Sequence, residues 1–276
     1  MSDKRQWNAR EQRQREIERS IVKKFRKEIW CRFTKAINEY ELIQDGDKIA
    51  VCVFGGKASM LMAKLFQEIL RHGQKNFEAV YLLMNPGQSE EEYELIRNNA
   101  ELLGIPATII SSQTLDAALQ EAKEAGCNKA ALGNHFDDVI ETILIGMLYG
   151  AKIQTMMPKL HSMDVEGMEL VRPLCLVREE DIIRWEKYND LQFVQCDDSF
   201  TRSCGNSANT ENKANRHEIK KLIRELREKS PYIEKNIFRS VENVNLSTIV
   251  AYKKDGVKHH FLDTYETEIK KRGGTQ

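Results

Sequence analysis

Two glycines followed by a lysine and a serine form the first group of residues that could bind a ligand. In segment 51–59, an apolar run precedes Gly55 and Gly56, and a helical pattern that contains Lys57 and Ser59 follows them. A turn from strand to helix suits an anion, because glycines allow close backbone approach and the first helical N–H groups point at the ligand. Lys57 would add a positive charge and Ser59 a hydroxyl donor. The spacing is not that of a Walker A loop, and a tight turn without a ligand is an equally good interpretation.

A second polar motif joins an apolar run to a helical pattern at residues 132–142. It contains Gly133, His135, Asp137 and Asp138. Carboxylates at such a position could hold Mg²⁺ or orient a substrate. The alternative interpretation is helix capping, with Asp137 as the cap and acidic charge in the first turn.

Lys159 and Arg172 form a third candidate group. Each lies beside a proline, in the segments Met157-Pro158-Lys159-Leu160 and Arg172-Pro173-Leu174. Both side chains could face phosphates, although surface charge is the more common role of such residues.

Short apolar runs alternate with helical patterns between residues 48 and 148, and these elements must position the motifs. The expected strands cover 48–53, 77–84, 105–110 and 130–133. The expected helices run to about residue 71, start at 89–91, and cover 115–125 and 137–148. This order predicts an α/β fold with a Rossmann-like parallel sheet, flanked by helices through right-handed crossovers. Such sheets bind ligands beyond the carboxyl ends of their strands. Both glycine-containing motifs follow strands, so we expect them at the same edge.

The remaining segments suggest three regions along the chain. Residues 9–42 predict one long helix, because apolar residues recur at every fourth position from Ile17 to Ile37, and this helix lies within a basic amphipathic region 1–45. We expect a nucleotide-binding α/β domain over 46–200, in which 151–177 is irregular or a hairpin and 178–190 is helical. We expect a polar loop over 197–215 that continues into the last region, 201–276, and a helical C-terminal part after it, with helices near 216–229 and 231–244.

Charge and composition narrow the classes of function. The chain has 276 residues with 42 Lys plus Arg and 42 Asp plus Glu, so no global attraction to nucleic acid or membrane is expected. Residues 1–35 nevertheless hold 12 Lys plus Arg against 5 Asp plus Glu, which suits either a polyanion-binding arm or a solvated helix face. The sequence has no apolar run long enough for a membrane span and no signal-peptide core. We expect a cytoplasmic protein, and a homodimer is one assembly that the sequence allows.

Taken together, the motifs resemble the PP-loop ATP pyrophosphatases, in particular the tRNA 2-thiocytidine synthetase group. The loop of that family reads Ser-Gly-Gly-Lys-Asp-Ser, and this chain has Phe54-Gly55-Gly56-Lys57-Ala58-Ser59. The second family motif, Leu-Gly-His-His-x-Asp-Asp-x-x-Glu-Thr, matches residues 132–142 except at Asn134. Further matches at 147–150, 157–160, 172–174 and 178–182 extend the resemblance over residues 45–200.

The resemblance implies an ATP-dependent enzyme that adenylates a tRNA cytidine and then replaces its oxygen with sulfur. Gly55, Gly56, Lys57, Ser59, Gly133 and His135 would bind ATP, Asp137 and Asp138 would lie near Mg²⁺, and Lys159 and Arg172 would contact phosphates or tRNA. The basic N-terminal helix would hold the tRNA. In the family, sulfur delivery uses an Fe–S cluster held by a Cys-x-x-Cys pair and a later cysteine, for which Cys196 is the candidate remnant.

Several residues depart from the family pattern. Phe54 replaces a hydroxyl and is expected to place its ring at the loop entrance, Ala58 removes a carboxylate, and Asn85 and Asn134 replace an Asp and a His. None of the six cysteines forms a Cys-x-x-Cys pair. A cluster needs three or four ligands, so an Fe–S cluster is not expected here.

Three interpretations of the function follow. The chain is an active tRNA sulfurtransferase with another sulfur source, a non-catalytic binding or scaffold protein with a degenerate site, or a PP-loop ligase that needs no cluster. The losses at both halves of the chemistry favour impaired or absent activity.

Overall fold

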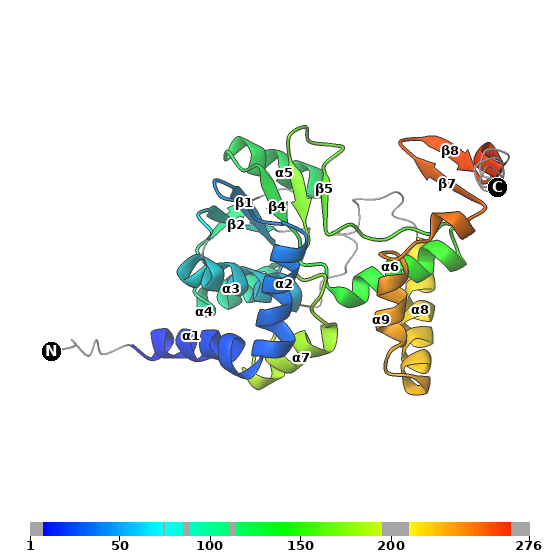
Figure 1. Ribbon diagram of the computed structural model, residues 1–276. Coiled ribbons are helices and arrows are strands. Elements are labelled where there is room, and N and C mark those ends of the chain that lie inside the picture. Colours follow the sequence, from blue (N-terminus) through cyan, green and yellow to red (C-terminus); the bar gives the residue numbers. More distant parts are fainter. Residues whose placement is uncertain (1–7, 74, 85–88, 111–113, 195–209, 266–276) are drawn as a thin grey trace. The chain divides into compact units, whose positions relative to one another are not determined.

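The computed structural model describes residues 8–73, 75–84, 89–110, 114–194 and 210–265 (Figure 1). The chain divides into two compact units, Met1–Arg224 and Glu225–Gln276. Within the described ranges, no helix is both long enough and apolar enough to cross a membrane. Cys196 and Cys204, Asn85, and most of the expected polar loop lie outside the described residues.

A six-stranded sheet forms the centre of the first unit (Figure 1). Its order is β3-β2-β1-β4-β6-β5, and every neighbouring pair is parallel except β5 with β6. The strands are β1 (Lys48–Val53), β2 (Glu78–Met84), β3 (Ala107–Ile110), β4 (Lys129–Ala131), β5 (Lys159–His161) and β6 (Glu169–Val171). The expected parallel α/β sheet is confirmed, and the segment 151–177 supplies a hairpin.

Helices connect the parallel strands. The connecting helices are α3 (Lys57–His72), α4 (Glu90–Leu102) and α5 (Leu115–Glu124), and α6 (Phe136–Leu148) leads from β4 to the hairpin of β5 and β6. The helices α7 (Glu179–Tyr188) and α8 (Thr210–Lys229) follow the last strand of the sheet. The chain builds β1, β2 and β3 outward in one direction and then returns to place β4 beside β1. The strand order therefore reverses between β1 and β4, which is where open α/β sheets bind their ligands.

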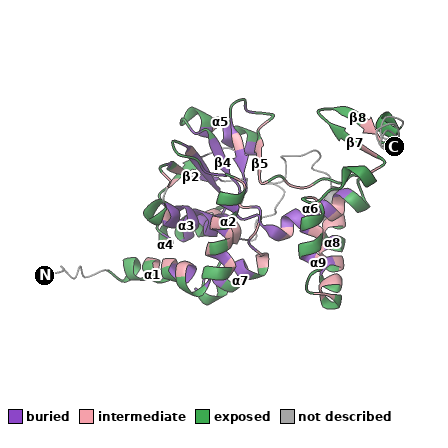
Figure 2. Cartoon of the chain, in the orientation of Figure 1, coloured by how far each residue is buried: buried purple, intermediate pink, exposed green. Residues whose placement is uncertain are grey.

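In the central strands β1 and β4, consecutive residues are buried, so both faces of the sheet are covered there, as expected for parallel strands flanked by helices (Figure 2). On the α5 face, Ala50, Cys52 and Phe54 follow one another at every second position and belong to a single apolar cluster. Leu115, from the first turn of α5, belongs to the same cluster. The period of two along β1 thus extends one residue past the strand and buries Phe54.

The N-terminal helical region differs from the expected single α-helix. It comprises α1 (Ala9–Arg19), two π-helical turns at Ser20–Lys24 and Arg26–Trp30, and α2 (Cys31–Glu39). Its π-type bonds run from Phe25 N to Ser20 O at 2.9 Å and from Trp30 N to Phe25 O at 3.4 Å.

The apolar repeat of four explains the π turns. An α-helix has about 3.6 residues per turn, so a repeat of four drifts by about 40° at each step. The wider π turns reverse this drift. As a result, all members of the stripe remain buried: Ile17, Ile21, Phe25, Ile29, Phe33 and Ile37.

The C-terminal unit adds a β-hairpin to its helices. The helix α9 (Ile233–Ser240) confirms the expected helix near 231–244, and α8 confirms the one near 216–229, although α8 begins at Thr210, inside the expected loop. The strands β7 (Ala251–Lys254) and β8 (Val257–His260) pair antiparallel, whereas we expected this region to be helical. Asp255 and Gly256 both have positive φ, 51° and 78°, which is the geometry of a type I′ hairpin turn.

Candidate functional site

The two glycine-containing motifs meet at the switch point between β1 and β4. A Cβ atom added to Gly133 would lie 3.1 Å from the backbone nitrogen of Ser59 and 3.2 Å from its Cα. A side chain at this position would force the loop after β4 and the first turn of α3 apart by a few tenths of an ångström. The structure therefore brings the second motif against residues 54–59, which resemble the family loop and which we call the PP-loop, as the order of strands predicts.

The backbone geometry of the PP-loop is suited to an anion. Gly55 has φ +86°, and a Cβ there would lie 2.3 Å from Cγ1 of Ile96. Gly56 is the N-cap of α3 and provides no side-chain cap, so the N–H groups of the first helical turn point out of the helix end.

The Ser59 hydroxyl closes the PP-loop. It donates to the Gly56 carbonyl at 3.0 Å and accepts from the Phe54 N–H at 3.2 Å. The hydroxyl therefore has a structural role in the loop, in addition to the ligand contact that the sequence predicts.

The structure corrects the expectation for Phe54. Its side chain belongs to the apolar cluster with Met84 and Leu132 and is 4% exposed, so the ring is a core residue and does not obstruct the loop entrance. Removing a buried phenylalanine side chain costs about 3–5 kcal/mol of stability. Phe54→Ser is therefore expected to destabilise the chain, and a change in ligand binding by this variant could not be assigned to the loop.

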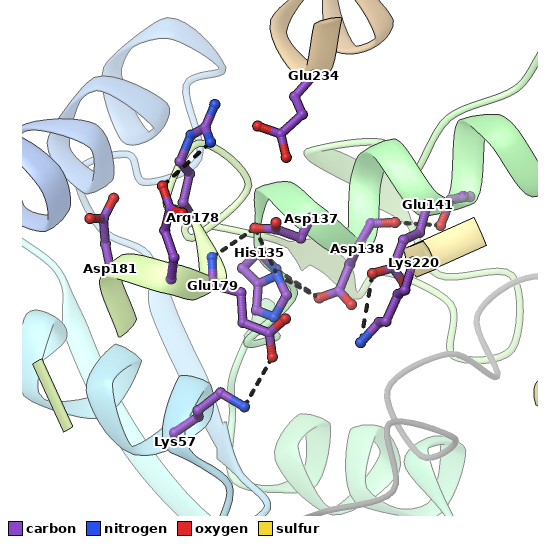
Figure 3. Close-up of polar contacts among 12 residues, drawn as sticks. Lys57, His135, Asp137, Asp138, Glu141, Arg178, Glu179, Asp181, Lys220 and Glu234 are labelled. Carbon is purple, nitrogen blue, oxygen red and sulfur yellow. Dashed lines mark hydrogen bonds and ion pairs between the residues drawn. The ribbon is translucent and has the colours of Figure 1, made fainter. Parts of the chain in front are cut away.

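Lys57 faces an acidic partner that the sequence analysis did not assign to the site. Its Nζ lies 3.0 Å from Oε1 of Glu179, in the first turn of α7 (Figure 3). Burial alone would raise the pKa of Glu179, but the nearby His135 and Lys57 outweigh it and hold the pKa below its usual value. Glu179 is therefore ionised at neutral pH and neutralises Lys57.

The acidic side chains of the second motif bind backbone donors. Asp138 Oδ2 accepts from the His135 N–H at 2.9 Å, and Asp137 Oδ2 accepts from the Glu179 N–H at 2.7 Å. The first contact caps α6, and the second ties α6 to the start of α7. Helix capping is therefore confirmed, but the expectation that Asp137 caps this helix is wrong, because His135 is the N-cap of α6 and Asp138 completes the capping box. The acidic residues also lie near the loop (Figure 3).

His135 is a buried polar group at this edge. Its Nδ1 lies 3.4 Å from Asp138 Oδ2 and 3.9 Å from Asp137 Oδ2, and it makes no hydrogen bond within the described part of the chain. A buried nitrogen in this position is suited to meet a polar group of a ligand.

The carboxylates fit a magnesium ion that arrives with a nucleotide better than a resident metal. Among the described residues, no three His, Cys, Asp or Glu side chains gather closely enough to hold a metal ion. Protein-bound Mg²⁺ commonly takes one or two carboxylates and completes its coordination with water and phosphate oxygens. Asp137 and Asp138 can supply that number.

The described cysteines do not fit an Fe–S cluster. Cys52, Cys127 and Cys175 are buried and Cys31 is exposed, and no three of the described cysteines form a metal-binding group. The candidate remnant Cys196 lies outside the described residues.

Arg172 and Lys159 have different surroundings. Arg172 is 2% exposed, and it donates from Nε to Asn134 Oδ1 at 3.2 Å and from Nη1 to the Met157 carbonyl at 2.5 Å. Lys159 Nζ donates to the Glu41 carbonyl at 3.2 Å. Arg172 thus supports the second motif through Asn134, the residue that departs from the family pattern.

Glu141 forms a second ionic centre that the sequence analysis did not identify as a site. It is 2% exposed, and its carboxylate lies 2.8 Å from Arg216 Nη1 and 3.7 Å from Lys220 Nζ, both on α8. Burial and the nearby Asp138 raise the pKa of Glu141 to about 7, against the lowering effect of Lys220 and Arg216. The acidic position within the second motif was the only sequence signal, because its partners lie on a distant helix.

Comparisons with known proteins agree with the motifs. The PP-loop domain family matches residues 25–226. The tRNA-cytidine(32) 2-sulfurtransferase of Bdellovibrio bacteriovorus is 30% identical over 85% of this chain and 93% of its own length. The enzyme of the same name from Alcanivorax borkumensis is 28% identical over 82% and 84% of the two chains.

A solved structure shows the same fold. The U34-tRNA thiolase NcsA from Methanococcus maripaludis, determined with its [4Fe-4S] cluster, has a TM-score of 0.56 and 18% identity, and the alignment covers 76% of each chain. The strand order, the two motifs at its switch point and the extent of these matches lead to one conclusion: the chain belongs to the PP-loop domain family.

Proposed function

We propose that this chain binds Mg-ATP and a tRNA, and that its capacity for tRNA cytidine 2-thiolation is impaired. Gly55, Gly56 and Lys57 form the phosphate cradle, with Ser59 closing the loop. Gly133 and His135 from the second motif complete the nucleotide site, and Asp137 and Asp138 lie near the nucleotide's magnesium ion. The tRNA-cytidine(32) 2-sulfurtransferases among the relatives support tRNA as the second ligand.

One observation carries the proposal: the loop retains its backbone cradle but lacks its acidic side chain. Gly55 has a positive φ and Gly56 leaves the N-terminal end of α3 without a side-chain cap, while Ala58 stands where the family has Asp. Losing one electrostatic group at a reacting phosphoryl group costs about 10²–10³ in rate. Binding should therefore survive better than adenylation.

The cysteines also support impaired activity, because they affect the sulfur-transfer step of the reaction. The described cysteines do not gather into a cluster site, and the chain has no Cys-x-x-Cys pair. A member of this family without a cluster would need a different sulfur source.

A single-turnover assay tests this proposal. The protein, in excess over a tRNA transcript, is incubated with Mg-ATP and sulfide, AMP is quantified by chromatography, and nucleosides are analysed by mass spectrometry. The Bdellovibrio bacteriovorus relative, prepared with its cofactors, is the positive control. We expect AMP formation to be at least about 10²-fold slower than in the control, with no 2-thiocytidine. Stoichiometric AMP with thiolated tRNA would contradict the proposed impairment, and AMP with a sulfur-free adduct would indicate the ligase alternative.

A further inference from the structure

A row of cations lies opposite the buried stripe of the N-terminal helical region. Arg19, Lys23 and Lys27 are spaced by four residues, like the buried Ile21 and Phe25, but are offset from them by two positions. An offset of two places a side chain about 200° around the helix. The π turns that keep the apolar stripe buried therefore also keep these cations aligned, and all three are exposed.

The row is poorly neutralised by its own helix. Glu18 is committed to Lys64 and Arg71, at 2.8 and 2.6 Å, and Glu16 lies 3.8 Å from Arg13. Within the part of the chain that the structure describes, Arg19, Lys23 and Lys27 make no ion pair. Like charges four residues apart on a helix repel one another by a few tenths of a kcal/mol, so this row does not serve the stability of the helix.

The row runs towards the PP-loop along α7. At one end Arg13 donates to the carbonyl of Asn189, just after α7, and at the other end Arg32 lies 2.9 Å from Asp181, in the first turn of α7. That same turn carries Glu179, the partner of Lys57 (Figure 3). The N-terminal helical region and α7 are therefore antiparallel, and the Lys27 end of the row is the end nearer the site.

We propose that Arg19, Lys23 and Lys27, which we call the basic row, bind the phosphate backbone of an RNA and direct it towards the PP-loop. Aligned cations neutralise successive phosphates and release counterions, which is the main source of affinity in non-specific nucleic-acid binding. The apolar face of this helical region is already buried in the protein, so it cannot insert into a membrane as an interfacial helix does. The choice of RNA rests on the proposed function.

The test compares two triple variants of the full-length chain. The first is Arg19→Gln, Lys23→Gln and Lys27→Gln. The matched control is Lys253→Gln, Lys254→Gln and Lys258→Gln, which removes the same charge from exposed lysines of the C-terminal hairpin. Binding of a fluorescent tRNA transcript is followed by anisotropy, without ATP, between about 50 and 200 mM salt.

We expect the basic-row variant to lose at least about tenfold in affinity at the lowest salt and to reduce the slope of log K against log salt by about 2–3. The control should retain near wild-type affinity and slope. Equal losses in both variants, a larger loss in the control, or wild-type binding by the basic-row variant would overturn the proposal. So would an absence of tRNA binding by the wild type, or binding to anionic lipid vesicles, but not tRNA, that depends on the row.

Two further measurements keep the result interpretable. Thermal unfolding shows whether the triple variant folds, and Lys23→Glu, a single reversal at an exposed position, replaces it if it does not; unchanged tRNA affinity of Lys23→Glu would then overturn the proposal. Titration of the same proteins with Mg-ATP separates the two proposals. If the basic-row variant loses tRNA binding but still binds Mg-ATP, the loss is due to the basic row. If the wild type does not bind Mg-ATP, the proposed function is wrong.

Discussion

Lys57 Nζ lies 3.0 Å from Glu179 Oε1, so the lysine of the PP-loop is already paired with a carboxylate from α7. Glu179 is in turn fixed by its backbone N–H, which donates to Asp137 at 2.7 Å. The loop, the second motif and α7 are thus linked through one residue. An anionic ligand that enters the cradle competes with Glu179 for Lys57.

Glu179→Gln is expected to bind Mg-ATP about 3- to 10-fold more tightly, because it removes the competing charge but keeps the backbone contact to Asp137. Calorimetric titration measures the change. Glu180→Gln is the matched control, since it removes the same charge from the neighbouring residue, which lies 3.4 Å from Arg178. Unchanged or weaker binding by Glu179→Gln would show that the carboxylate does not compete with the nucleotide.

Ala58→Asp is expected to increase ATP affinity by about tenfold in the presence of Mg²⁺ and to decrease it in excess chelator. The restored carboxylate would attract the metal ion but repel the bare phosphates. Ala58→Asn provides a side chain of similar size without charge. If both variants respond alike with and without Mg²⁺, the loop position does not face the metal ion of the nucleotide.

Gly133→Ala is expected to lower the free energy of unfolding by about 1–3 kcal/mol and to weaken Mg-ATP binding. The added Cβ would lie 3.1 Å from the Ser59 backbone nitrogen, so either the second motif or the first turn of α3 must move. Urea unfolding and calorimetry measure the two effects. Wild-type values in both would contradict the close packing of the two motifs.

Glu141 is expected to make stability depend on pH. Its pKa rises from 4.5 to about 7 in the folded chain, so between these values the folded state holds a proton that the unfolded state releases. This contribution is complete below about pH 4.5 and is lost as the pH rises through about 7, with an upper limit of about 3 kcal/mol.

Glu141→Gln should remove this contribution, so its stability relative to the wild type should increase as the pH rises. Unfolding by urea at several values between about pH 5 and 8 measures the difference. Parallel profiles for the two proteins would show that Glu141 titrates near its ordinary value and remains ionised beside Arg216.

Local sequence features predicted the sheet and the two motifs well. The apolar run 48–53 and the glycines after it are contiguous, so they identify β1 and the loop without knowledge of the rest of the fold. The pairing of Lys57 with Glu179 and the contacts of Glu141 to α8 were not predicted, because they join segments that are far apart in the sequence and depend on how the chain packs.

Three other features of the structure differ from what we expected, although the sequence contains a signal for each of them. The period of two in Ala50 and Cys52 continues to Phe54 and predicts its burial in the core. An apolar repeat of four, rather than 3.6, indicates the π turns. Asp255-Gly256 between two extended segments is a common signal for a hairpin, and it was outweighed by the expectation of a helical C-terminal part.

Titration of the wild-type protein with Mg-ATP, followed by calorimetry and thermal unfolding, tests the central claim most directly. We predict saturable binding, a gain of about 2.7 kcal/mol in stability at 100 times the dissociation constant, and binding at least about tenfold weaker in Lys57→Ala. Neither heat nor stabilisation up to millimolar Mg-ATP, or equal binding by Lys57→Ala, would contradict the assignment of Gly55, Gly56 and Lys57 as a nucleotide cradle.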